Sequence, residues 1–229
     1  IQRGAPIAIV GADMTGASDL FWYTRADRPF KSFADLAAGD LVSFSRPGAS
    51  TETVVKSLLE HYKSKGKAVP SGSPPETLTQ VMSGQISAGW GTAPLPKAFA
   101  EGKVRIIARG NDAPKLATVT TRVHAVNATY LAKNPEAVKA FLRGYEKTID
   151  AVYKDPQVLD RAAALLKITP AEAKQILTDF FPRKAFTIDR IGDLDASIEQ
   201  AVSNKQLKGP LTDAQKAAIH KTVAELNKK

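Results

Sequence analysis

The sequence has 229 residues, of which 43% are hydrophobic and 24% charged, a composition typical of a folded globular protein and not of a disordered chain. Its 32 basic and 23 acidic residues give a net charge of +9, spread along the chain, which disfavours nucleic-acid binding and favours encounter with small anions or acidic partners. The absence of cysteine excludes disulfides, thiolate metal sites and cysteine nucleophiles.

The first half of the chain alternates short apolar segments with helical patterns. Strands are predicted at residues 6–10, 20–25, 41–44, 86–90 and 104–108. Helices are predicted after Ser32, after Thr51 and at Ser73, where a cap serine precedes Pro74 at the first helical position. This order predicts an α/β fold with mainly parallel sheets flanked by helices.

The second half is mostly helical. A strand is predicted at residues 119–126, where the chain would cross back from the first part of the fold to the second. Helices are then expected to open at Asn134 and Thr169, and at about residues 191–204 and 214–227. No apolar run approaches the roughly 20 residues of a membrane-spanning helix, which excludes a transmembrane protein. The opening at Ile1, without a methionine or a leader, indicates a processed or partial chain.

The loop after the first strand invites a phosphate-loop interpretation. The spacing from Gly11 to Gly16 fits that motif, but Ala17 follows where the motif needs lysine, so a nucleotide triphosphatase is rejected and a turn is predicted. Asp13, Met14 and Thr15 nevertheless follow a strand, and ligands collect at the carboxyl ends of strands in open α/β sheets. These three residues are therefore candidate ligand contacts.

A stronger candidate is the loop that joins the strand at 41–44 to the next helix. Backbone N–H groups at a helix N-terminus attract anions, Gly48 allows close approach, and Ser50 or Thr51 can donate a hydroxyl. Alternatively, Ser50 only caps the helix. Trp90, between two glycines, forms either a flat pocket wall or part of the core.

No catalytic constellation is visible. His61, His124 and His220 have no triad or metal spacing around them, and the acidic residues form no paired-carboxylate motif. The sequence therefore predicts no catalytic residue, no metal site and no cofactor.

Five segments together resemble the substrate-binding proteins of ABC importers in the NMT1/THI5-like group for nitrate, sulfonates, taurine and thiamine precursors. They are residues 7–11 with 20–25, 30–36, 48–51, 82–90 and 130–142. The segment that opens with Asn134-Pro135-Glu136 is the most similar to the family pattern.

The resemblance implies a type II periplasmic-binding-protein fold with two lobes and a helical C-terminal part. Lobe one would comprise residues 1–25 and 119–180, lobe two residues 26–118, and the C-terminal helices residues 181–229. The family begins with strand–helix units that this chain lacks, so the first lobe is expected to be incomplete.

The resemblance further implies a periplasmic, monomeric solute-binding component that delivers a small molecule, expected to be an anion such as a sulfonate, nitrate or carboxylate, to the membrane subunits of an ABC permease. The ligand would lie in an interlobe cleft, with no nucleic acid as partner. The expected ligand-binding residues are Asp13, Met14, Thr15, Arg46, Gly48, Ala49, Ser50, Thr51, Trp90, Gly91 and Thr92.

Two departures weaken any transfer of ligand specificity: Ser87 stands where the family has aspartate, and Ala49 where a hydroxyl is common. Two other classes stay open. One is the effector-binding half of a transcription regulator, which would need a DNA-reading segment upstream. The other is a pyrimidine-synthase-like enzyme of the same fold, against which the lack of cysteine and of clustered histidines argues.

Overall fold

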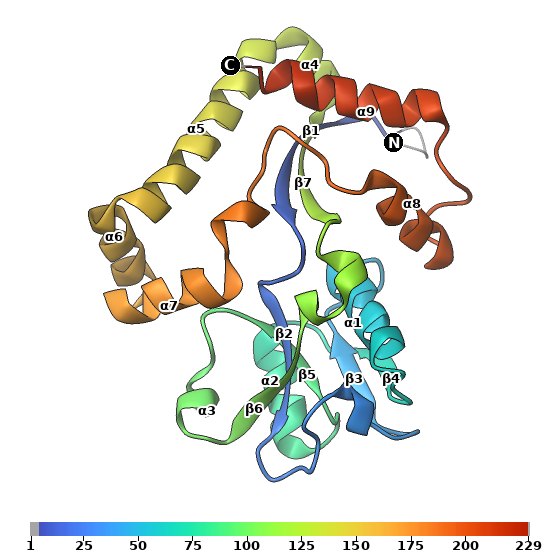
Figure 1. The fold of residues 1–229 in the computed structure, drawn as a ribbon, viewed down its shortest axis with the longest axis vertical. Helices are drawn as coiled ribbons and strands as arrows, with labels where there is room; N and C mark the ends of the chain where they lie inside the picture. The colour runs from blue at the N-terminus through green and yellow to red at the C-terminus, as the bar shows by residue number, and fades with distance from the viewer. Residues whose placement is uncertain (1–4, 229) are drawn as a thin grey trace. The chain divides into compact units, whose positions relative to one another are not determined.

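The computed structural model describes residues 5–228, which form two compact units (Figure 1). One unit holds the described residues up to Thr15 and from Thr118 onward, and the other is Gly16–Ala117. The opening segment Ile1–Gly4, on which the expectation of a processed chain rests, lies outside the described residues. Within residues 5–228, no helix combines the length and apolar character needed to cross a membrane.

The unit Gly16–Ala117 is built on short strands. Strand β2 (Leu20–Arg25) lies between β5 (Gly89–Thr92) and β6 (Val104–Arg109) and is antiparallel to both. Strand β3 (Leu41–Phe44) pairs in parallel with β4 (Lys67–Pro70). A parallel bridge between Val42 and Ala88 connects β3 to the start of β5.

The prediction of mainly parallel sheets is therefore wrong, although the α/β class is confirmed. The sheets are small and most strand pairs are antiparallel. The physical reason is that only a crossover connection forces a strand to run parallel to the previous one. Helices α1 (Ser50–His61) and α2 (Pro74–Ser83) link β3, β4 and β5, which run in the same direction, whereas β2 lies between β5 and β6 and runs against both.

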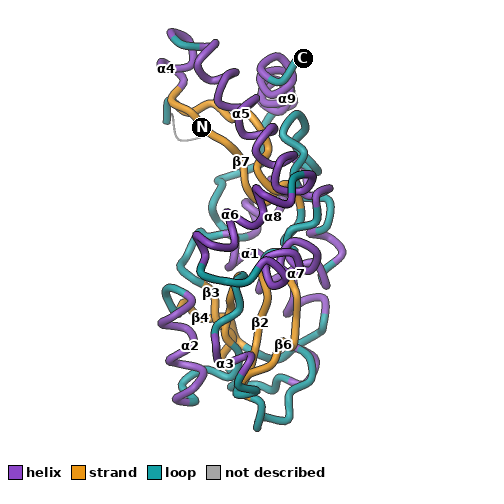
Figure 2. The backbone as a smooth tube through the Cα atoms, turned by 90° about the vertical axis from the view of Figure 1, so that its left-hand side faces the viewer, coloured by secondary structure: helices purple, strands orange, loops and turns teal. Residues whose placement is uncertain are grey.

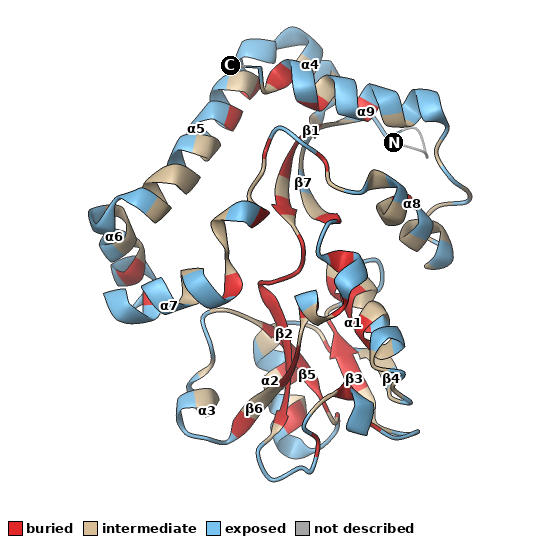
Figure 3. Ribbon diagram, viewed as in Figure 1, coloured by how far each residue is buried: buried red, intermediate tan, exposed pale blue. Residues whose placement is uncertain are grey.

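Helices cover both faces of these strands (Figure 3). Helix α1 (Ser50–His61) buries Val54, Val55 and Leu58 in one core cluster with Trp22. The next residue of β2, Tyr23, points to the opposite face, since successive strand residues alternate. There it lies near Thr77 and Val81 of helix α2 (Pro74–Ser83), around the position that a side chain at Gly89 would take.

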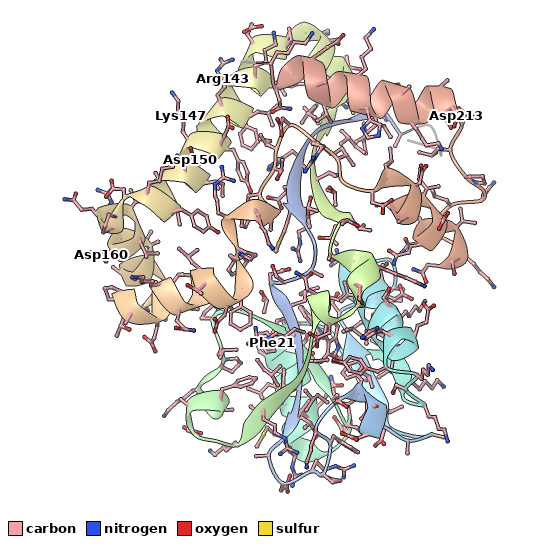
Figure 4. All side chains as sticks on the ribbon, in the orientation of Figure 1. Phe21, Arg143, Lys147, Asp150, Asp160 and Asp213 are labelled. Carbon is pink, nitrogen blue, oxygen red and sulfur yellow. The ribbon has the colours of Figure 1, made fainter. Side chains whose placement is uncertain are left out.

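The glycines around Trp90 are required by this packing. A Cβ atom at Gly89 would lie 2.6 Å from Val81, and one at Gly91 would lie 2.8 Å from the ring of Phe21, which Figure 4 labels on β2. Both distances are shorter than normal Cβ contacts, so the two positions admit no side chain without rearrangement. A short helix, α3 (Lys97–Ala100), brings Phe99 edge-on to Phe21.

The other unit has one two-stranded antiparallel sheet, β1 (Ile7–Thr15) with β7 (Thr120–Asn127), and several helices. The helices are α4 (Ala128–Lys133), α5 (Pro135–Lys154), α6 (Pro156–Leu166), α7 (Pro170–Phe180), α8 (Leu194–Ser203) and α9 (Asp213–Leu226). Val10 packs with α5 and with Leu226 of α9, and Ala12 packs with Ile219 and Val223 of α9. Helix α9 thus contributes to both core clusters that bury β1.

The prediction of a turn at residues 11–16 is wrong for residues 11–15, which belong to strand β1. Strand β1 continues through Gly11 and Asp13, and shifts in its register with β7 accommodate the glycine-containing sequence. The chain also forms β4, α4 and α6, which the sequence patterns did not predict. Helix α1 ends at His61 rather than near Gly66.

Removal of the cap of helix α9 is expected to destabilise the unit that contains it. The Thr212 hydroxyl accepts the Gln215 N–H at 3.2 Å, and the Gln215 side chain accepts the Thr212 N–H at 2.9 Å. Thr212→Ala should therefore lower the free energy of unfolding by about 1 kcal/mol in urea denaturation. Thr148→Ala, within α5 and exposed, is the control and should cost less, because an internal threonine gives no such cap. Equal losses for both variants would contradict the prediction.

Candidate functional site

Loops that follow three parallel strands meet at one edge of the unit Gly16–Ala117. Strands β3, β4 and β5 run in the same direction, so their carboxyl ends lie at the same edge. The Gly72 N–H donates to the Ser45 carbonyl at 3.0 Å, and the Trp90 indole N–H donates to the Gly72 carbonyl at 3.2 Å. Gly72 therefore connects the two loops that the sequence selected separately.

Sequence reasoning missed Gly72 as part of this region. The sequence around Gly72 indicates only the start of a helix at Ser73, and that prediction is confirmed, since Ser73 is the N-cap of α2. A glycine at the end of a strand was the available signal for a position beside a ligand. Gly72 has φ +83°, and a Cβ there would overlap the Glu76 carboxylate.

The loop between β3 and α1 is stabilised by hydrogen bonds between two of its own residues, Ser45 and Thr51. The Thr51 hydroxyl accepts the Ser45 N–H at 3.1 Å and shares a hydrogen bond with the Ser45 hydroxyl at 2.8 Å. Thr51 is only 5% exposed, so its hydroxyl fixes the loop from the inside. Gly48 has φ +82° and open space at its Cβ position, which is the left-handed conformation that favours glycine.

The alternative in which Ser50 caps the helix is wrong. Ala49 is the N-cap and forms no side-chain cap bond, and Ser50 is the first helical residue. Among residues 5–228, no acceptor is found for the backbone N–H groups of Ser50 and Thr51. Such groups, with the positive end of the helix dipole, provide donors for an anion.

Arg46 supplies the positive side chain of the loop. It is exposed, and within the described part of the chain its guanidinium has no ion-pair or hydrogen-bond partner. Its carbonyl accepts the Ala49 N–H at 3.2 Å, which places the arginine in the turn that precedes α1. A free guanidinium and free helix N–H groups in one loop are a combination that suits a small oxyanion.

A carboxylate of the chain already occupies part of this helix end. Glu52 accepts the Gly48 N–H at 2.7 Å and the Lys56 ammonium at 2.8 Å. The hydrogen bond from Lys56 contributes most to lowering the pKa of Glu52, and the bond from Gly48 adds to it. An anion that binds the Gly48 N–H must therefore displace Glu52.

The bonds of Glu52 predict a pH-dependent stability. Because its folded-state pKa lies below the ordinary value of 4.5, these bonds contribute stability above that pH and lose it as the pH falls through the folded-state pKa. Glu52→Gln should be about 0.5–1 kcal/mol less stable than the parent near pH 7 and converge on it near pH 3, as measured by urea denaturation. A constant difference at both pH values would exclude this role for the Glu52 charge.

The Trp90 side chain is part of the core cluster. It is 8% exposed, lies opposite Trp22 in the strand pair, and its backbone N–H donates to the Ser43 hydroxyl at 2.8 Å. Gly91 is buried and Thr92 is half-buried at the end of β5. The edge of the indole that bonds Gly72 is the part of Trp90 nearest the strand-end loops. Direct contact of Trp90, Gly91 and Thr92 with a ligand stays a prediction.

Asp13, Met14 and Thr15 belong to the other unit. The Tyr145 hydroxyl donates to Asp13 at 2.5 Å, and His124 Nε2 lies 3.8 Å from the same oxygen. Burial, together with the Asp13 carboxylate, raises the pKa of Tyr145, which keeps the phenol protonated as a donor. Met14 is 2% exposed, and Thr15 bonds the Thr120 hydroxyl at 2.9 Å. Ligand contact by these three residues also stays a prediction.

Across residues 5–228, no three His, Cys, Asp or Glu side chains lie together in a way that could hold a metal ion. The hydroxyl, amide N–H and guanidinium groups described above can each donate a hydrogen bond to an oxyanion.

A sequence profile for the family described as NMT1/THI5 like matches residues 1–158, which is more than half of the chain. The chain belongs to the NMT1/THI5-like family. The resemblance seen in the sequence is thereby confirmed. No curated protein matches the chain by sequence.

Solved structures with the same fold include binding proteins and an enzyme. The aliphatic sulphonate binding protein SsuA of Escherichia coli is 17% identical, with a TM-score of 0.68 over 98% of this chain and 70% of its own. SsuA of Xanthomonas axonopodis pv. citri, bound to MOPS, is 15% identical, with a TM-score of 0.73 over 90% of this chain and 71% of its own. The desulfurization enzyme DSZB is 15% identical, with a TM-score of 0.59 over 96% and 80% of the two chains. At these identities the likeness shows the periplasmic-binding-protein fold alone.

Proposed function

We propose that this NMT1/THI5-like protein is the solute-binding component of an ABC importer and binds a small oxyanion at the strand-end loops of the unit Gly16–Ala117. The observation that carries the proposal is the β3–α1 loop, where the free guanidinium of Arg46 precedes the unbonded N–H groups of Ser50 and Thr51. The family membership and the fold shared with sulfonate-binding proteins support it.

The ligand class follows from this chemistry. A sulfonate or carboxylate oxygen accepts hydrogen bonds from several N–H donors at once, and a guanidinium adds charge and direction. The net charge of +9 favours encounter with anions over a longer range. Glu52 opposes a second negative charge at Gly48, so a monoanion suits the loop better than a dianion.

The remaining parts of the assignment follow from the same proposal. A solute-binding protein of an importer works outside the cytoplasmic membrane, so we place this protein in the periplasm or at the outer surface of the membrane. Its partner would be the membrane subunits of a permease. Ligand contact by Asp13, Met14 and Thr15 is part of the same proposal.

Isothermal titration calorimetry tests the proposal. Ethanesulfonate, MOPS and acetate are titrated into the protein at low ionic strength, with ethanol as an uncharged control. Saturable binding of one or more anions without binding of ethanol is expected. Ser50→Ala should lower the affinity, because it removes the hydroxyl donor that lies beside the free N–H groups. Because Trp90 is a core residue, its truncation would also cost stability, so Ser50 gives the cleaner test. An absence of heat with all three anions, in a protein shown to be folded by circular dichroism, would refute the proposal.

The fold shared with DSZB favours a second candidate, an enzyme that acts on a sulfur oxyacid. A related DSZB structure is a cysteine-to-serine variant that holds biphenyl-2-sulfinic acid, whereas these 229 residues contain no cysteine. Incubation of the protein with that sulfinate, followed by assay for released sulfite, separates the two functions. Release of sulfite above the uncatalysed rate would establish the enzyme instead.

A further inference from the structure

A cavity of about 630 Å³ lies among three successive helices of the unit that contains the residues from Thr118 onward. Helix α6 contacts both α5 and α7, and Figure 2 shows the three helices in purple. The cavity is lined by the C-terminal end of α5, the first half of α6, one face of α7 and the residues 182–183. Its volume falls within the range of roughly 300–1,000 Å³ that is usual for small-molecule sites.

The walls of this cavity are mostly apolar. Aliphatic side chains come from all three helices, and prolines line it at the starts of α6 and α7: Val152, Leu159, Leu177, Pro156 and Pro170. Such walls favour a ligand with an apolar group, because its transfer from water into the cavity removes apolar surface from solvent.

Most polar side chains of the cavity are already bonded within the unit. Lys154 and Arg183 both donate to the carboxylate of Asp150, at 2.8 and 2.7 Å, and Figure 4 labels Asp150 on α5. Asp155 caps the N-terminus of α6. The two hydroxyl groups of the cavity donate to backbone carbonyls. These groups therefore stabilise the walls and are not available to a ligand without the loss of a bond.

Two charged side chains of the cavity differ from the rest. Asp160 of α6, labelled in Figure 4, and Lys174 of α7 both line it. Within residues 5–228, neither side chain has an ion-pair or hydrogen-bond partner, and the two do not pair with each other. Both residues are exposed, so a ligand can reach them from solvent. The cavity thus offers one carboxylate and one ammonium beside apolar walls.

We propose that the cavity among α5, α6 and α7 binds an amino acid with an apolar side chain, at a site separate from the strand-end loops. The ligand carboxylate bonds the ammonium of Lys174, and the ligand ammonium bonds the carboxylate of Asp160. The apolar side chain lies against the aliphatic walls. A simple anion or a simple cation fits less well, because it satisfies only one of the two charges.

Isothermal titration calorimetry with L-phenylalanine tests the proposal, at pH 7 and low ionic strength, where ion pairs are least screened. Saturable binding is expected. Three analogues each lack one of the recognised groups: 3-phenylpropanoate has no ammonium, 2-phenylethylamine has no carboxylate, and glycine has no apolar side chain. Each analogue should bind about tenfold more weakly or less, since each loses one set of contacts. Equal affinity for L-phenylalanine and 3-phenylpropanoate would contradict recognition of a zwitterion.

Variants of the chain locate the site. Lys174→Met and Asp160→Asn should each weaken the binding of L-phenylalanine by about tenfold, whereas Lys147→Met, at an exposed position of α5 outside the cavity, should leave it unchanged. Ser50→Asp should also leave it unchanged, because Ser50 belongs to the strand-end loops of the other unit. Loss of binding in Ser50→Asp would place the amino acid at those loops and overturn the proposal. An absence of heat with L-phenylalanine, in protein shown to be folded by circular dichroism, would overturn it as well.

Discussion

Replacement of Trp22 by alanine is expected to lower the free energy of unfolding by about 3–5 kcal/mol, which is the usual cost of removing a large aromatic side chain from a core. Trp22 is fully buried, lies in the cluster that contains Val42 and Leu58, and donates its indole N–H to the Ser43 carbonyl at 2.7 Å. The substitution therefore leaves a cavity and also an unpaired buried carbonyl.

Urea denaturation followed by circular dichroism gives the measurement for Trp22→Ala. Leu95→Ala is a suitable control, because Leu95 belongs to the same unit and is 40% exposed. The control should lose less than about 1 kcal/mol, as exposed positions usually do. If both variants lose the same amount, the core around Trp22 is not the main source of stability in this unit.

The second large effect concerns ligand binding. Ser50→Asp should weaken the binding of ethanesulfonate by about 100-fold, equivalent to about 2.7 kcal/mol, because it places a carboxylate among the donors that the anion needs. The same substitution should leave the fold unchanged or slightly more stable, since an acidic residue in the first turn interacts favourably with the helix dipole. Loss of affinity without loss of stability separates a ligand contact from a structural residue.

The matched control for Ser50→Asp is Thr79→Asp, which adds the same charge at an exposed position of α2. Calorimetry should show an affinity within about twofold of the parent for this control, because an exposed charge away from the loop is largely screened. An affinity for ethanesulfonate that is similar in Ser50→Asp and in the parent would remove the α1 N-terminus from the proposed site.

Capping chemistry made the helix starts predictable. Thr169 and Ser73, each with a glutamate three residues later, begin helices where the sequence placed them. Helix α6 was missed, because Asp155-Pro156 starts it directly after α5 and no loop separates the two patterns. Strand β4 was missed because its four residues carry no clear alternation. Strand direction was predicted wrongly, since it depends on pairing between segments far apart in the chain.

The sequence selects the loops at residues 48–51 and 90–92, and the resemblance assigns both to one ligand site, but the contact that joins them is not predictable from the sequence. The contact that joins them is made by Gly72, whose carbonyl and N–H carry no sequence signal of their partners. The structural role of Thr51 was not predictable either. A hydroxyl in the first turn of a helix can bind a ligand, or it can accept a hydrogen bond from the preceding loop, as Thr51 does from the Ser45 N–H. The capping of the Gly48 N–H by Glu52 also depends on the loop conformation, which local patterns do not determine.

The Asn227 side chain donates to the Val10 carbonyl at 3.0 Å, and Leu226 packs in the same cluster as Val10. Strand β1 therefore completes its contacts only after a residue 217 positions later in the chain has been made. Residues 16–117, by contrast, form a continuous segment whose contacts are mostly internal. During synthesis on the ribosome we expect this segment to fold before β1, which stays exposed until helix α9 has emerged.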